Sequence, residues 1–135
     1  MACLWIDANV ILRFITGDPP EMAAQALELM NRAEKGETCL RLSHLVVAEA
    51  VWVLSSFYEY TRREIADTLI PFIRADGVRA ENPDLVVQAL QDMADKNVDF
   101  VDAFLAAQAR RHGEGVCSFD NDFARLKVTW VKPPG

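Results

Sequence analysis

The sequence predicts an α/β protein, a three-layer sandwich in which helices flank a mainly parallel central sheet of about five strands. Short continuous apolar runs such as "CLWIDA" are typical of strands that are covered on both faces. These runs alternate with longer segments of helical periodicity, and strands separated by helices pair in parallel through right-handed crossovers. We therefore expect the functional crevice outside the carboxyl ends of the strands.

The individual elements follow from local patterns. The predicted strands are "CLWIDA", "TCLRLS", "GVCSF" and "VTWVKP". The predicted helices cover residues 21–36, 43–58, 61–77, 82–96 and 98–113. Gly36 and Gly113 stand at positions that end helices, and Ser43 is a predicted N-cap. Asn82 and Pro83 form an N-cap and first-position pair, whereas Pro71 is expected to end or kink its helix.

Length and composition indicate one globular domain over residues 1–135. Of the residues, 51% are hydrophobic and 25% are charged, without a stretch of 18 or more apolar residues of the kind that spans a membrane. The first residues form a strand-like run and lack the basic region and cleavage site of a signal peptide. We expect a cytoplasmic protein without a membrane partner.

The net charge and the cysteines limit the kinds of binding site that the chain can form. The formal net charge of -6 argues against a broad basic surface for nucleic acid, so a phosphate-bearing partner would need local cationic groups. Cys3, Cys39 and Cys117 lie in apolar runs and lack the spacing of a metal site. We expect them to be reduced core residues.

Several acidic residues fall where such a crevice would be. Asp7 follows the first strand, and Asp120 follows "GVCSF", with Asp122 just beyond it. Asp99 and Asp102 are three residues apart at the start of a predicted helix, close enough to share a face. Glu49 has only apolar residues within four positions, so we expect it to be buried and to need a partner.

Each acid also has a structural interpretation. Asp99 suits an N-cap, Asp102 complements a helix dipole, and Asp120 and Asp122 are common turn formers. A buried ionised Glu49 is harder to explain, because it costs several kcal/mol and its helix carries no basic residue. A carboxylate cluster around one or two divalent cations, Mg²⁺ or Mn²⁺, accounts for all of them together. Zinc ligands and a phosphate-binding loop are not evident in the sequence.

Four segments contain most of these acids, in the order "IDANVILRFITGD", "LVVAEAVWVL", "DFVDAFLAAQA" and "SFDNDFARL". In this order and spacing they resemble the four motifs of PIN-domain ribonucleases, and more narrowly those of VapC-type toxins of bacterial toxin–antitoxin pairs. The resemblance runs over nearly the full length. It implies a PIN-like fold and a metal-dependent endoribonuclease that acts on RNA, forms a homodimer and is held inactive by a cognate antitoxin.

The resemblance also implies roles for single residues. Asp7, Glu49, Asp102 and Asp120 match the four acids of the family, with Asp122 as the second choice for the last position and Asp99 as an auxiliary candidate. Asn9 matches the supporting amide. Ser118 stands where the family often has threonine, and its hydroxyl is a candidate partner for a carboxylate or a water.

These acids predict a mechanism in which Mg²⁺, with Mn²⁺ as a substitute, activates a water for in-line attack on the scissile phosphate. Arg13, six residues after Asp7, is a candidate contact for the RNA backbone. Two alternatives remain at this point. One is a phosphotransfer protein of the haloacid-dehalogenase or receiver type, which Asn9 and the missing strand-end lysine disfavour. The other is a non-catalytic PIN-like interaction domain.

Overall fold

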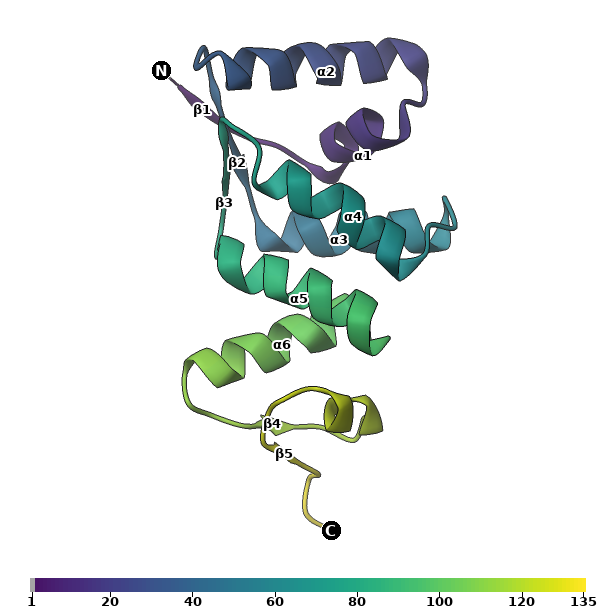
Figure 1. Cartoon of the computed structure of the whole chain (residues 1–135), viewed down its shortest axis with the longest axis vertical. Coiled ribbons are helices and arrows are strands. Elements are labelled where there is room, and N and C mark those ends of the chain that lie inside the picture. Colours follow the sequence, from purple (N-terminus) through teal and green to yellow (C-terminus); the bar gives the residue numbers. More distant parts are fainter. Residues whose placement is uncertain (1) are drawn as a thin grey trace. The chain divides into compact units, whose positions relative to one another are not determined.

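A computed structural model describes residues 2–135 and divides the chain into two compact units, Met1–Pro83 and Asp84–Gly135 (Figure 1). Each unit combines helices with parallel strands, so the predicted α/β class is confirmed. Within residues 2–135, no helix combines the length and the apolar character needed to cross a membrane.

The first unit holds a three-stranded parallel sheet with the strand order β1-β2-β3. Helices α1, α3 and α4 lie on one side of these strands in Figure 1. The elements in chain order are β1 (Cys3–Trp5), α1 (Ala8–Thr16), α2 (Pro20–Glu34), β2 (Cys39–Leu42), α3 (His44–Ser56), α4 (Arg62–Ile73) and β3 (Val78–Ala80).

Alternation along β2 determines which face of this sheet is buried. Leu40 and Leu42 are almost completely buried, while Arg41 between them points to the opposite face. The register pairs Arg41 with Trp5 of β1 on one side and with Arg79 of β3 on the other. The aliphatic face of β2 therefore lies in the core, and Arg41 shares the opposite face with Trp5 and Arg79.

Local capping explains where the helices of this unit begin. The Ser43 hydroxyl accepts the N–H of Leu45 at the start of α3, as predicted. At α4, Thr61 and Glu64 form a reciprocal capping box. The helix α4 continues past Pro71 to Ile73, so the expectation that Pro71 ends this helix is wrong. Pro71 is exposed three residues before the C-cap, where little of the helix follows it.

The second unit consists of two helices and a small parallel strand pair. Its elements are α5 (Pro83–Lys96), which starts at the last residue of the first unit, α6 (Phe100–Arg111), β4 (Val116–Cys117), a 3-10 helix η1 (Asn121–Arg125) and β5 (Trp130–Val131). The buried Asp92 of α5 accepts from Gln88 and pairs with Arg110 of α6 at 3.5 Å. This pair links the two helices.

Further sequence-based expectations differ from the structure. The helix α1 and the strand β3 are absent from the predicted elements, because α1 shares one apolar run with β1 and β3 has only three residues. Cys3 and Cys39, expected to be reduced, form a disulfide because the register of β1 and β2 places them opposite each other. Cys117, expected in the core, is exposed.

Candidate metal centre

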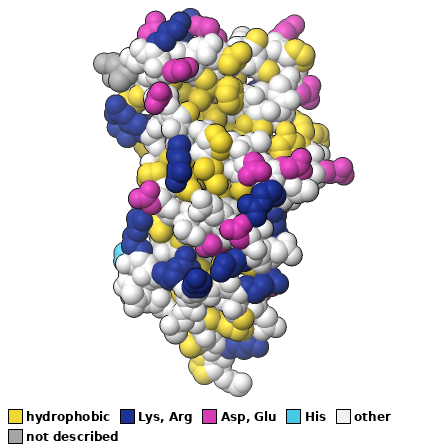
Figure 2. Space-filling model, viewed as in Figure 1, with side chains coloured by type: hydrophobic (Ala, Val, Ile, Leu, Met, Phe, Trp, Pro, Cys, Tyr) yellow, Lys and Arg dark blue, Asp and Glu magenta, His cyan; other side chains and the backbone are white. Residues whose placement is uncertain are grey.

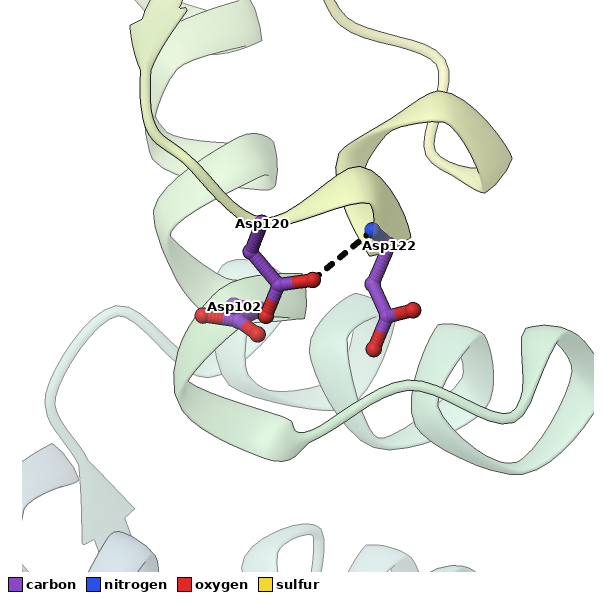
Figure 3. Close-up of side chains that lie close together, drawn as sticks. All are labelled: Asp102, Asp120 and Asp122. Carbon is purple, nitrogen blue, oxygen red and sulfur yellow. Dashed lines mark hydrogen bonds between the residues drawn. The ribbon is translucent and has the colours of Figure 1, made fainter. Parts of the chain in front are cut away.

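Three aspartates of the second unit come together although they are up to 20 positions apart in the chain. Asp102, Asp120 and Asp122 each offer a carboxylate oxygen, and these oxygens all lie within 4.8 Å of one another. Figure 3 shows Asp102 reaching from α6 toward the two aspartates of the segment that follows β4. All three are among the acids that the sequence suggested as metal ligands.

Backbone hydrogen bonds hold the two later aspartates in place. The Ser118 hydroxyl accepts the N–H of Asp120 at 3.0 Å, and the Asp120 carboxylate accepts the N–H of Asp122 at 2.8 Å (Figure 3). The indole N–H of Trp130 donates to the Ser118 carbonyl at 2.9 Å, which ties this turn to β5. Ser118 thus bonds the backbone of the turn and not a carboxylate, so its hydroxyl positions Asp120 indirectly.

Asp102 lies in the first turn of α6, where the helix dipole favours a negative charge. Even so, its pKa is raised above the usual value of 3.8, first by burial and then by the negative charges of Asp120, Asp99 and Asp122. Mutual repulsion of this kind is what a bound cation relieves.

One cation of the chain already lies beside the cluster. The Arg125 guanidinium contacts the Asp122 carboxylate at 2.6 Å and also donates to the Asn97 carbonyl. The ion pair offsets the charge of Asp122 and leaves Asp102 and Asp120 without a bonded cation among residues 2–135. Sequence analysis missed Arg125, although its spacing of three residues from Asp122 on a short helix is the signal that could have revealed it.

The donor set fits a hard divalent cation. Mg²⁺ and Mn²⁺ prefer carboxylate oxygens, and Mg²⁺ is usually held by one or two carboxylates with waters completing its coordination. Asp102 and Asp120 are therefore sufficient as protein ligands, with Asp122 close enough to assist. No cysteine or histidine belongs to the cluster.

Comparison with known families decides the affiliation of the chain. The family model described as PIN domain matches residues 4–128, a range that contains every candidate acid. The chain belongs to the PIN domain family. A search of the curated proteins found none that matches the chain.

Membership has direct functional consequences. PIN domains are generally nucleases, so the chain has a hydrolase-type function that implies binding of RNA, and divalent metals are typical of these domains. The α/β architecture of both units agrees with the PIN-like fold. The phosphotransfer interpretation of the strand-end aspartates is thereby set aside.

Two of the acids expected at the PIN site belong to the first unit. Asp7 is exposed, follows β1 and serves as the N-cap of α1, where its carboxylate accepts the N–H of Val10 at 3.2 Å. This capping bond provides a structural reason for an acid at that position. Glu49 was expected to be buried, but it is exposed. Its apolar neighbours Leu45 and Trp52, one turn away on either side, are exposed as well, so the first unit does not cover this face of α3.

The other candidate residues from the sequence are Asp99, Arg13 and Asn9. Asp99 occupies the N-cap position of α6 without the side-chain capping bond expected of it, and its charge acts on Asp102. Arg13 donates to the Asp18 carbonyl at 2.7 Å and to the Tyr58 hydroxyl at 3.2 Å, so its guanidinium fixes the turn after α1. Asn9 lies beside Arg13 at a hollow of about 490 Å³ between α1 and α2.

Proposed function

We propose that this PIN domain is an Mg²⁺-dependent endoribonuclease that hydrolyses phosphodiester bonds in RNA, and that it is a VapC-type toxin of a bacterial toxin–antitoxin pair. The observation that carries the nuclease proposal is the convergence of Asp102, Asp120 and Asp122 in a chain of this family. The family match runs through both units, which supports one PIN domain over residues 1–135.

In this proposal Asp102 and Asp120 hold the cation, with Asp122 and Asp99 nearby. Asp120 is the better fourth acid than Asp122, because the carboxylate of Asp122 is engaged by Arg125. Mg²⁺ bound here supplies a nucleophile at neutral pH and offsets the charge on the scissile phosphate. Mn²⁺, which has the same preference for oxygen ligands, would substitute.

The chain's own groups would orient the site. The bonds from Ser118 to the turn and from Asp120 to the backbone of Asp122 hold the aspartates in one geometry before substrate binds, which lowers the cost of organising them during the reaction. Asp7 and Glu49 are proposed as further acids of the same reaction, with Asn9 in support, because they match the family's motifs in order and spacing. Both carboxylates are exposed and so accessible to a cation or substrate.

The toxin assignment implies protein partners. A cognate antitoxin would silence the enzyme with a basic side chain, an arginine above all, placed among the acids in place of the metal. A homodimer is supported by large apolar side chains at the surface of the first unit. Met22 and Leu27 of α2 are each about half exposed. Such a toxin would act on RNA in the cytoplasm.

Cleavage of a labelled RNA by purified protein tests the nuclease proposal. We expect cleavage with Mg²⁺ or Mn²⁺ and none in EDTA, and Asp102→Asn should lower the rate by more than about 100-fold, since even groups that only support a metal ligand contribute 10- to 100-fold. Asp67→Asn is the matched control, because Asp67 is an exposed acid on α4 outside the cluster. Cleavage by Asp102→Asn at the wild-type rate would refute the site. A wild-type protein that never cuts RNA would favour the non-catalytic alternative.

A separate experiment tests the toxin assignment. Expression in bacteria without an antitoxin should arrest growth, and Asp102→Asn should relieve the arrest at an equal protein level. Normal growth of cells that express active wild-type nuclease would contradict the toxin assignment while leaving the nuclease proposal in place.

A further inference from the structure

Arg125 is held beside the metal cluster by two contacts of one nitrogen, all within the second unit. Its Nη2 donates to an Asp122 carboxylate oxygen at 2.6 Å and to the Asn97 carbonyl oxygen at 3.2 Å. An Nη nitrogen carries two hydrogens, so both of them are engaged. Asn97 lies in the turn between α5 and α6, the helix that carries Asp102. Arg125 is the last residue of η1, whose N-cap is Asp120. The guanidinium therefore joins the two segments that supply the cluster.

The ion pair makes the three acids of the cluster unequal. Arg125 contacts Asp122, while no lysine or arginine among residues 2–135 forms an ion pair with Asp102 or Asp120. Because the contact is short and the arginine is also anchored at a carbonyl, the charge of Asp122 is offset in one defined geometry. The cluster therefore consists of two carboxylates without a cation of their own and a third with an internal one.

This inequality affects how many metal ions the cluster can hold. Nucleases with two metal ions place them about 3.5–4 Å apart, so that both stabilise the reacting phosphate. The cluster has the size for such a pair, because its ligand oxygens lie within 4.8 Å of one another. If Asp102 and Asp120 hold the first ion, only Asp122 of the cluster is left for a second, and there Arg125 is already bound. A guanidinium and a divalent ion at one carboxylate repel each other, so they are alternatives.

We propose that Arg125 takes the place of a second metal ion, so that the centre binds one divalent cation and obtains its other positive charge from the protein. This inference rests on the proposed metal-dependent nuclease function and adds to it the number of ions and a residue that determines this number. Arginine suits the place because it stays protonated and its N–H donors match phosphate oxygens. Within residues 2–135, Nε and Nη1 of Arg125 form no hydrogen bond, so these donors remain for a phosphate.

A purely structural ion pair is the alternative explanation. Figure 2 shows acidic side chains interspersed with lysine and arginine on the face in view, and ion pairs three residues apart stabilise helices in general. Two features distinguish Arg125. Its partner Asp122 belongs to the metal cluster, and its second contact reaches Asn97 in the turn before α6. Removal of a structural pair would leave the number of bound metal ions unchanged, so a count of these ions separates the two explanations.

Titration of the full chain with Mn²⁺ counts the bound ions without RNA. The EPR signal of free Mn²⁺ gives the number bound per chain, and Asp102→Asn identifies the ions that belong to this centre. We expect one such ion in wild type and two in Arg125→Gln, which lacks the charge. The first ion should also bind at least about threefold more tightly in Arg125→Gln, because a positive charge within a Debye length is removed. Arg125→Lys retains the charge and should keep the count at one.

The matched control is Arg111→Gln, which removes the same charge from the last turn of α6. Arg111 is exposed and lies about 13 Å from Asp102 along the helix axis, beyond the Debye length of about 8 Å at physiological salt. Its Mn²⁺ count and affinity should equal those of wild type. Circular dichroism confirms that each variant is folded, and cleavage of labelled RNA is measured in parallel.

Several results would overturn the role of Arg125 and leave the nuclease function in place, if wild type cleaves RNA. They are two ions of this centre in wild type, a single ion in Arg125→Gln, and two ions in Arg125→Lys. An equal change in Arg111→Gln would also overturn it, because total charge would then set the count. A wild type that binds no Mn²⁺ through Asp102 would refute the metal-dependent nuclease and this inference together. If the counts are as expected but wild type never cleaves RNA, the nuclease proposal fails and the role of Arg125 stands.

Discussion

Replacing Asp102 by asparagine should stabilise the metal-free protein and abolish its stabilisation by metal. Two unit charges 4.8 Å apart, the limit within which the cluster oxygens lie, repel by about 0.9 kcal/mol in water. Salt at about 0.15 M, with a Debye length of about 8 Å, reduces this to about 0.5 kcal/mol. Asp102 faces Asp120 and Asp122, and Arg125 offsets part of the charge of Asp122, so Asp102→Asn should add between about 0.5 and 1 kcal/mol to the free energy of unfolding, or about 2 to 3 °C in Tm for a domain of this size.

Metal should stabilise the wild type much more than Asp102→Asn. At about 100 times its dissociation constant, a cation that binds only the folded state stabilises it by about 2.7 kcal/mol, or about 8 °C. Wild type should show this gain with Mn²⁺ or Mg²⁺, and Asp102→Asn should lose most of it. Differential scanning fluorimetry in EDTA and in a metal series measures both. An equal metal-induced shift in the two proteins, or no shift in wild type, would refute the assignment of Asp102 as a ligand.

The same substitution carries a pH signature. The pKa of Asp102 lies above 3.8 in the folded protein, so the unfolded chain releases this proton first as the pH rises. Stability is lost through that window, and the full loss is present once the pH exceeds the folded pKa. The advantage of Asp102→Asn in EDTA should therefore be small at about pH 4 and complete at about pH 7. An advantage that does not change over this range would mean that like-charge repulsion and burial are not its cause.

Three further predictions concern single acids. Asp7→Ser keeps a capping oxygen for Val10, so Tm should stay within about 2 °C of wild type while RNA cleavage is lost; cleavage at the normal rate would reduce Asp7 to a cap. Asp120→Asn should lower cleavage more than Asp122→Asn, because Arg125 already engages Asp122; the reverse order in the same assay would exchange their roles. Asp92→Ala leaves Arg110 unpaired beside a buried gap and should cost about 3 kcal/mol in urea unfolding; a loss below about 1 kcal/mol would show that the link is unimportant.

The sequence was sufficient for features that depend on neighbours along the chain. Ser43 caps α3 and Pro83 opens α5 as predicted, because capping and the fixed φ of proline act over one helical turn. The alternation of apolar runs and helical periodicity was sufficient for the α/β class and for placing Asp120 and Asp122 after a strand. The sequence did not predict the short strand β3, because three residues are too few to show a period.

Side-chain partners across the chain could be known only from the tertiary structure. Asp102 and Asp120 are 18 positions apart, and only the packing of α6 beside β4 brings their carboxylates together. The exposure of Glu49 and the Cys3–Cys39 disulfide likewise depend on what lies opposite α3 and β1, which local patterns do not encode. The neighbours of Arg41 across the sheet are the clearest case. Trp5, Arg41 and Arg79 are ordinary residues in three separate segments, and strand register alone makes them neighbours, because pairing in a parallel sheet is set by the packing of the helices between the strands.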